Sequence, residues 1–170
     1  MIKKLLESKD ILNKITTKTE ISFKSKKFNR NLIDKFNLKI DLAYGRMNYL
    51  KSFYISDSFF KCKGNLNFLD DYPLLFFDCS IFSEDKNKLL KEFSIKSKFK
   101  KDVFKINVTG NLNILNKKIN LKNVLMNENY NASVEDLEYF MDVFENIVFN
   151  ESFEEIFSLK KIKDFILEIS

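Results

Sequence analysis

The sequence has no histidine and no tryptophan, and its 170 residues include only three glycines, one proline and two cysteines. Without histidine the chain cannot build a Ser-His-Asp or Cys-His catalytic unit, a histidine zinc helix or a Cys2His2 finger. The glycines Gly45, Gly64 and Gly110 lie too far apart for a phosphate-binding glycine loop, and no Cys-x-x-Cys pair is present. We therefore expect a protein that is not an enzyme and that uses neither a metal nor a cofactor.

Arginine is also scarce. Only Arg30 and Arg46 are arginines, so 27 of the 29 basic residues are lysines, a bias that an AT-rich coding sequence would produce. The planar fork of arginine favours bidentate recognition of phosphate and guanine, and lysine lacks it. The net charge of +5 therefore does not predict a nucleic-acid partner.

Charge is unevenly distributed along the chain. Residues 1–126 hold 26 basic and 13 acidic side chains, whereas residues 127–157 hold nine acidic and no basic ones. This asymmetry favours two structural layers that attract each other, with the acidic segment against the lysine-rich sheet. The alternative is a basic layer that faces an acidic partner.

The hydrophobic period changes once, near residue 130. Apolar alternation between residues 21 and 126 predicts six to eight antiparallel strands in a meander, with short helical segments near 2–15 and 84–92. With 45% hydrophobic residues, the chain can bury a substantial core as one domain, or as the C-terminal fragment of a longer protein. The sequence thus predicts an α+β fold in which a sheet over 1–126, curved into an open apolar groove, is followed by a helical cap over 127–170.

The helical cap has a clear predicted start. Ser133 and Asp136 form an acidic variant of the capping box, and apolar residues follow at spacings of three and four. A helix should therefore begin near Val134, with two shorter helices over 151–157 and 159–169.

A first hairpin is predicted with its turn at Asp70 and Asp71. In this register the directly opposite residues would be Phe60 and Ile81, Cys62 and Cys79, Lys63 and Asp78, Gly64 and Phe77, and Leu66 and Leu75. One face is then apolar, and a Lys-Asp pair lies on the other. The Phe77 ring would be placed to cover Gly64.

A second hairpin is predicted with its turn at Asn116 and Lys117. The opposite residues would be Ile114 and Ile119, Leu112 and Leu121, Val108 and Leu125, and Gly110 and Asn123. This register also produces one apolar face.

The two cysteines would lie opposite each other in the first hairpin. Two buried thiols are the simpler interpretation of Cys62 and Cys79, and a disulfide is the alternative in an oxidising compartment.

The apolar face of the two hairpins is a candidate lipid-binding groove, because acyl chains gain free energy when they leave water. Lysines at its rim could meet anionic headgroups. The alternative is a dry core closed by the C-terminal helices. The candidate lining residues are Phe60, Leu66, Leu75, Phe77, Ile81, Ile106, Val108, Leu112, Ile114, Ile119 and Leu121.

The order of segments over residues 36–170 resembles the C-terminal part of AsmA-like proteins of the bacterial envelope. The resemblance lies in the strand pair over 110–121, the acidic helix over 133–150 and the ending over 158–170. It implies a β-rich groove on the periplasmic side of the inner membrane, held by an upstream anchor, and a part in phospholipid transport and outer-membrane biogenesis. The present chain has no apolar segment of about 20 residues, so a true start at Met1 would instead predict a cytoplasmic protein.

Three functional hypotheses follow. The first is a non-enzymatic lipid-binding segment whose partners are phospholipid acyl chains and the envelope membranes. The second is a structural or protein-interaction module that terminates a longer β-rich protein and has no ligand of its own. The third, which the shortage of arginine disfavours, is single-stranded nucleic-acid binding by lysine and phenylalanine side chains.

Overall fold

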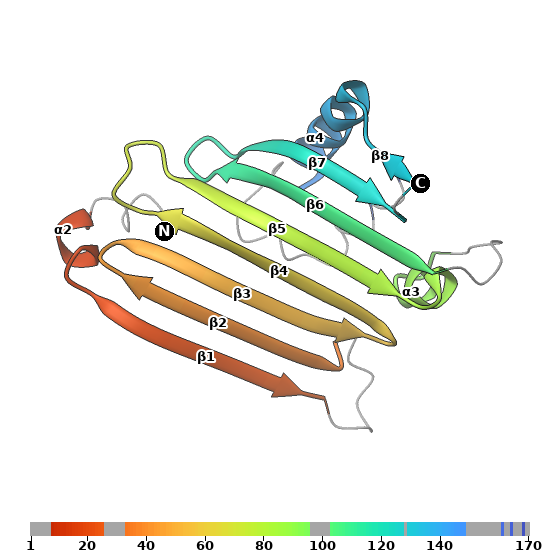
Figure 1. Cartoon of the computed structure of the whole chain (residues 1–170), viewed down its shortest axis with the longest axis horizontal. Coiled ribbons are helices and arrows are strands. Elements are labelled where there is room, and N and C mark those ends of the chain that lie inside the picture. The colour runs from red at the N-terminus through yellow and green to blue at the C-terminus, as the bar shows by residue number, and fades with distance from the viewer. Residues whose placement is uncertain are drawn as a thin grey trace.

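The chain folds around one open antiparallel sheet. The computed structural model describes residues 8–25, 33–95, 103–127 and 129–148, together with 161, 164 and 168. Eight strands follow one another in the order β1 to β8, and each pairs with its neighbours in sequence (Figure 1). The strands are β1 (Thr16–Lys24), β2 (Lys35–Ala43), β3 (Arg46–Ile55), β4 (Ser58–Asn67), β5 (Leu74–Ser83), β6 (Phe104–Asn113), β7 (Lys118–Met126) and β8 (Tyr130–Asn131). The helices are α2 (Lys9–Leu12), α3 (Lys86–Glu92) and α4 (Val134–Val148).

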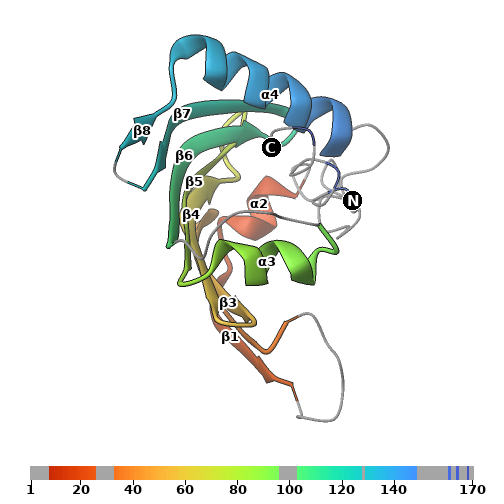
Figure 2. The ribbon, with the colours of Figure 1, turned by 90° about the vertical axis from the view of Figure 1, so that its right-hand side faces the viewer.

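This topology confirms the predicted meander and the helix that follows it. In Figure 2 the sheet bends, α2 and α3 lie on its inner side, and α4 runs along β7. No helix within the described ranges is both long enough and apolar enough to span a bilayer.

Tight turns between strands keep the meander regular. Tyr44 and Gly45 connect β2 to β3, and both have positive φ values, 50° and 72°. A two-residue hairpin turn with two such residues matches the right-handed twist of the flanking strands. Gly45 is buried against the Leu69 side chain, which occupies the space that a Cβ would need.

The side chains of the sheet separate into two faces. Directly opposite residues share a face, so the strand register assigns every position. The inner face carries the odd-numbered residues of β1, β3 and β5, the even-numbered residues of β2, β4 and β6, and four residues of β7, Ile119, Leu121, Val124 and Met126. The outer face carries the remaining positions.

Packing on the inner face is concentrated at the two ends of the strands. The first end cluster is formed by Leu12, Leu66, Phe68, Leu112 and Ile114. The second end cluster, at the opposite strand ends, is formed by Ile55, Leu89 and Phe93. Thus α2 contributes to one cluster and α3 to the other.

The first predicted hairpin is confirmed in its register. Cys62 lies opposite Cys79 and Lys63 opposite Asp78, in β4 and β5. The connection is wider than the predicted Asp-Asp turn, because the strands end at Asn67 and restart at Leu74. The six intervening residues remain centred on Asp70 and Asp71, which preserves the register.

The second predicted register is wrong. Leu112 pairs with Ile119 rather than Leu121, and Val108 pairs with Val124 rather than Leu125. The strands leave a four-residue loop over 114–117, so Ile114 lies in the turn and is buried in the first end cluster instead of facing Ile119. A bulge between Thr109 and Gly110 then shifts the register once more.

The predicted helices agree with the structure where it describes them. Ser133 and Asp136 form a reciprocal capping box, in which each residue's backbone N–H donates to the other's side chain, at 3.0 and 3.1 Å. The helix begins at Val134, as expected. The predicted helix over 151–157 lies outside the described residues, and of the last one only residues 161, 164 and 168 are described, each in helical conformation.

The predicted pairing of an acidic layer with the lysine-rich sheet is wrong for α4. Phe144 and Ile147 of α4 pack against the first end cluster, on the inner side of the sheet. In the part of the chain that the structure describes, one ion pair joins this helix to a strand, between Lys118 Nζ and Glu145 Oε2. Most strand lysines point to the outer face, which α4 does not cover.

Candidate functional site

The inner face is the candidate functional surface because its strand positions are almost entirely apolar. Of the predicted lining residues, ten lie on this face: Phe60, Leu66, Leu75, Phe77, Ile81, Ile106, Val108, Leu112, Ile119 and Leu121. The eleventh, Ile114, lies in the β6–β7 turn. Leu66, Leu112 and Ile114 are buried in the first end cluster, and the other eight are half-buried.

A middle strip separates the two end clusters on the inner face. It crosses the sheet from β2 to β6 and consists of half-buried residues that belong to neither cluster: Leu38, Ile40, Tyr49, Lys51, Cys62, Cys79, Ile106 and Val108. Of these, only Ile106 and Val108 were among the predicted lining residues, and the two cysteines were predicted as a cross-strand pair on the same face. The β2 and β3 members were missed, although the alternation of apolar residues in those segments was the available signal.

A disulfide bond lies in the middle strip. Cys62 and Cys79 are joined, with their Cα atoms 4.0 Å apart on neighbouring strands. The two-thiol interpretation therefore does not describe this structure, and the disulfide alternative does.

Lys51 is the only charged residue among the inner-face strand positions. It lies opposite Cys62, and its ammonium group is 5.3 Å from the centre of the Phe53 ring and 5.8 Å from that of Phe36. Burial lowers the pKa of Lys51 and raises the pKa of Tyr49 to about 12. Both shifts have the same cause, because partial burial in apolar surroundings disfavours the charged form of each group.

Two strand glycines allow neighbouring strands and rings to approach closely. A Cβ on Gly64 would lie 1.9 Å from the Phe76 carbonyl oxygen and 2.8 Å from the Tyr49 ring. A Cβ on Gly110 would lie 2.7 Å from the Phe77 ring. Gly64 lies opposite Phe77, as predicted, but the Phe77 ring does not cover it. The Tyr49 ring covers Gly64 instead, and the Phe77 ring covers Gly110.

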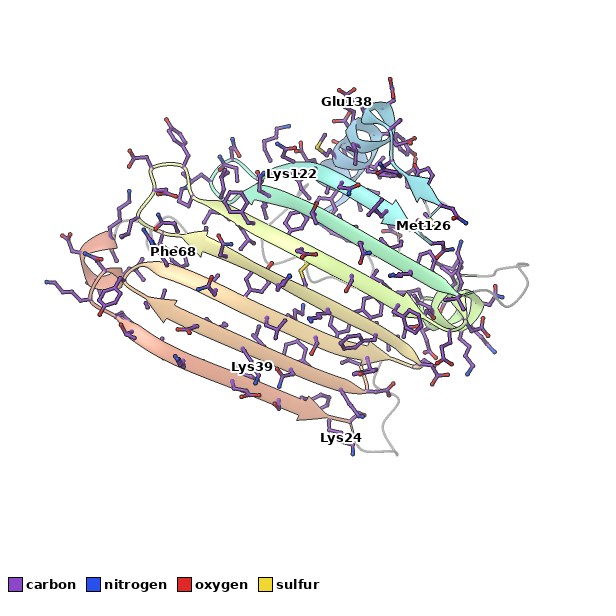
Figure 3. The ribbon with its side chains drawn as sticks, viewed as in Figure 1. Lys24, Lys39, Phe68, Lys122, Met126 and Glu138 are labelled. Atoms are coloured by element: carbon purple, nitrogen blue, oxygen red, sulfur yellow. A yellow bond between two sulfur atoms is a disulfide. The ribbon has the colours of Figure 1, made fainter. Side chains whose placement is uncertain are left out.

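The outer face differs from the inner face in being strongly basic. Ten exposed cationic side chains lie on it, and one of them, Lys118, pairs with Glu145 of α4. The other nine, which we call the basic face, are Lys18, Lys24, Lys35, Lys39, Arg46, Lys61, Lys63, Lys105 and Lys122. Figure 3 labels three of them, Lys24, Lys39 and Lys122. Three acidic residues share this face, and each pairs across strands: Glu20 with Lys39 at 3.2 Å, Asp41 with Lys18 at 3.8 Å and Asp78 with Lys63 at 3.2 Å.

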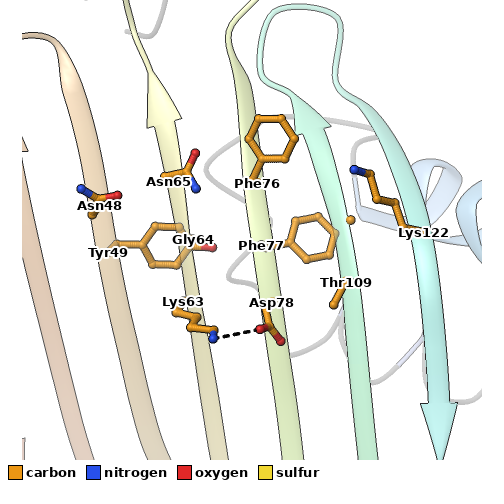
Figure 4. Close-up of a pocket in the computed structure, with 11 residues that line it drawn as sticks. Asn48, Tyr49, Lys63, Gly64, Asn65, Phe76, Phe77, Asp78, Thr109 and Lys122 are labelled. Atoms are coloured by element: carbon orange, nitrogen blue, oxygen red, sulfur yellow. Dashed lines mark ion pairs between the residues drawn. The ribbon is translucent and has the colours of Figure 1, made fainter.

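An open depression of about 460 Å³ lies in the basic face (Figure 4). Its polar lining includes Asn48, Asn65 and Thr109, and Lys63 and Lys122 lie at its sides. Its lining also includes Gly64 and Gly110. The depression offers amide, hydroxyl and ammonium groups, together with the carboxylate of Asp78, which pairs with Lys63 at 3.2 Å.

No family model, characterised protein or solved structure matches this chain. Within the described ranges, no group of three or more cysteine, aspartate or glutamate side chains could hold a metal ion.

The two edges of the sheet differ in whether another element covers them. At the β7 edge, the Ile119 N–H donates to Glu145 Oε1 at 3.0 Å and the Leu121 N–H donates to Met141 Sδ at 3.2 Å, so α4 satisfies edge donors. At the opposite edge, all nine residues of β1 are exposed. The sheet is thus capped on one side and open on the other.

Proposed function

We propose that this protein binds lipid acyl chains in an open apolar groove formed by the inner face of its curved sheet. The observation that carries this proposal is the half-buried middle strip between two packed end clusters. A fully closed core would bury the centre of the face most deeply. Here the ends are buried and the centre keeps exposed surface from β2 to β6, while Val124 of β7 is buried beside it. An acyl chain would gain about 0.8 kcal/mol for each CH2 group that it buries there.

The dimensions of the strip suit one acyl chain. From β2 to β6 it crosses four steps between neighbouring strands, which is about 19 Å at roughly 4.8 Å per step. Half of a bilayer's hydrocarbon core, the depth of one acyl chain, is about 15 Å. Lys51 would place a positive charge within the groove, where the phosphate of a bound lipid could meet it.

The cellular setting is part of the same proposal. The resemblance of residues 36–170 to AsmA-like proteins supports a segment on the periplasmic side of the inner membrane that takes part in phospholipid transport and outer-membrane biogenesis. The Cys62–Cys79 disulfide supports an oxidising compartment, because cytosolic thiols are normally kept reduced.

The groove can be tested by making the strip more polar with little change in side-chain volume. In the double variant Ile106→Thr/Val108→Thr, we expect the affinity for a fluorescent phospholipid to fall about tenfold, because two apolar contacts with the acyl chain are lost. The purified wild-type protein should also release phospholipid that mass spectrometry detects.

The matched control is Thr16→Val, an isosteric change at an exposed outer-face position of β1 that does not line the depression. It should leave phospholipid affinity unchanged, and circular dichroism should confirm that all variants are folded. Equal affinity in the double variant and the wild type, or protein free of lipid that does not bind the probe, would contradict the proposal.

The open β1 edge favours a second candidate function, a module that terminates a longer β-structure. Exposed edge strands pair readily with further strands. In a solution of this chain alone, a second copy can supply the pairing strand, so we expect concentration-dependent dimers in light scattering. Ile21, half-exposed on β1, is the residue to change: Ile21→Lys should weaken dimerisation at least tenfold.

The control for this experiment is Ile11→Lys, the same substitution at an exposed position on α2. Dimers that persist in Ile21→Lys, or a wild-type protein that stays monomeric at every concentration, would count against an adhesive edge.

A further inference from the structure

We propose that the basic face docks onto the surface of an anionic lipid bilayer. This inference does not rest on lipid binding by the inner face, because it concerns the opposite side of the sheet. The basic face has nine cationic and three acidic side chains, and all three acids are already paired with lysines across strands. The excess positive charge is complementary to a surface of phosphate headgroups.

The kind of cation favours a bilayer. Eight of the nine cations are lysines, which act as compact, hydrated point charges, and arginine forks suited to bidentate recognition are nearly absent. A diffuse layer of headgroups requires only positive charge near its surface. The open depression beside Lys63 and Lys122 adds room for a headgroup to enter the face.

Exposed aromatic rings lie among these lysines. Tyr54, Phe76 and Phe82 are each about two-fifths exposed on the outer face, at 39%, 39% and 42%. Aromatic and cationic side chains on one surface are typical of proteins that lie at a membrane interface.

The same combination of residues could stack single-stranded nucleic acid, but the geometry of the rings argues against that partner. The Lys122 ammonium lies 5.7 Å from the centre of the Phe76 ring, and that of Lys35 lies 5.4 Å from the centre of the Tyr54 ring. A base would need the ring faces that these cations occupy. A bilayer requires only that ring edges reach the interface.

The first test uses cosedimentation of the full chain with vesicles. We expect binding to vesicles of equimolar phosphatidylcholine and phosphatidylglycerol, no binding to phosphatidylcholine alone, and weaker binding as salt rises. The triple variant Lys35→Gln/Lys61→Gln/Lys122→Gln leaves all three cross-strand ion pairs in place. Since each lysine near an anionic surface contributes about fivefold, its affinity should fall on the order of a hundredfold.

The matched control removes the same charge elsewhere. Lys14→Gln/Lys91→Gln/Lys117→Gln changes three lysines outside the basic face, so it should retain most of the affinity. An equal loss of vesicle affinity in the two triple variants would overturn the proposed docking surface, because it would show that only the net charge of the protein matters. A single-stranded oligonucleotide that binds more tightly than the vesicles would also overturn it, in favour of nucleic acid.

A second test uses the absence of tryptophan from the natural sequence. A single tryptophan in the variant Phe82→Trp, on the outer face, should shift its fluorescence to the blue on anionic vesicles. The control Tyr72→Trp lies in the β4–β5 loop, at a residue that is 76% exposed, and should not shift. A shift in the loop variant but not in Phe82→Trp would overturn the proposed orientation. These outcomes are independent of acyl-chain binding, which the Ile106→Thr/Val108→Thr variant reports.

Discussion

The variant Gly64→Ala is expected to lose at least about 3 kcal/mol of unfolding free energy, because its new methyl group has no space. The added Cβ would lie 1.9 Å from the Phe76 carbonyl oxygen, which belongs to the backbone of the next strand. Relief therefore requires β4 and β5 to move apart, at the centre of the sheet. For a chain of this length, the melting temperature should fall by about 10 °C in a thermal denaturation followed by circular dichroism.

The Tyr49 ring provides a way to separate the causes of this loss. The ring is the second neighbour of the added methyl group, at 2.8 Å, and in Figure 4 it lies beside Gly64. If the backbone contact dominates, Tyr49→Ala/Gly64→Ala should be no more stable than Gly64→Ala. Recovery in the double variant would show instead that the ring is the obstacle.

A neighbouring substitution serves as the control for the glycine. Asn65 is exposed on the outer face of the same strand, so Asn65→Ala should change the free energy of unfolding by no more than about 0.5 kcal/mol. A melting temperature for Gly64→Ala equal to that of Asn65→Ala would refute the close strand approach.

The first hairpin could be predicted from the sequence because two independent patterns agree on it. Apolar residues alternate on both strands, and the same register brings Lys63 opposite Asp78. A slip by one residue would move every apolar side chain to the other face, so only one register satisfies both patterns. The loop can then be six residues long without disturbing the pairing.

The second hairpin could not be placed from local alternation alone. In β7 the apolar residues Ile119 and Leu121 are followed by Val124 and Met126, which breaks the period of two by one residue. The bulge absorbs the extra residue and keeps all four side chains on the inner face. The break in the period between Leu121 and Val124 was the available signal for the bulge. The predicted register did not use it, because it assumed a two-residue turn and an unbroken alternation.

The face of the sheet on which the strand lysines lie could not be predicted by counting charges. A count along the chain shows that the strands are basic and that the segment over 127–157 is acidic, but it does not show to which face the lysines point. Helix α4 must bury Phe144 and Ile147, and apolar burial outweighs exposed ion pairs, which contribute about 1 kcal/mol or less. The helix therefore packs on the apolar side and leaves the basic face uncovered.

Removal of the Cys62–Cys79 disulfide is expected to lower the free energy of unfolding by about 3 kcal/mol. The two residues are 17 positions apart, and a crosslink of that span removes conformational entropy mainly from the unfolded chain. Urea denaturation of the oxidised and reduced proteins should therefore show a lower midpoint with a reductant. The double variant Cys62→Ala/Cys79→Ala should resemble the reduced protein and should not respond to the reductant.

Thiol titration decides whether the stability difference comes from the crosslink. The oxidised protein unfolded in urea should react with no thiol reagent, whereas the reduced protein should react at two sites, because these are the only cysteines. Two reactive thiols in protein purified from an oxidising compartment would contradict the bond. If the bond forms but reduction leaves the midpoint unchanged, the pairing of β4 with β5 must already restrict the unfolded chain, since the crosslink would then remove no further entropy.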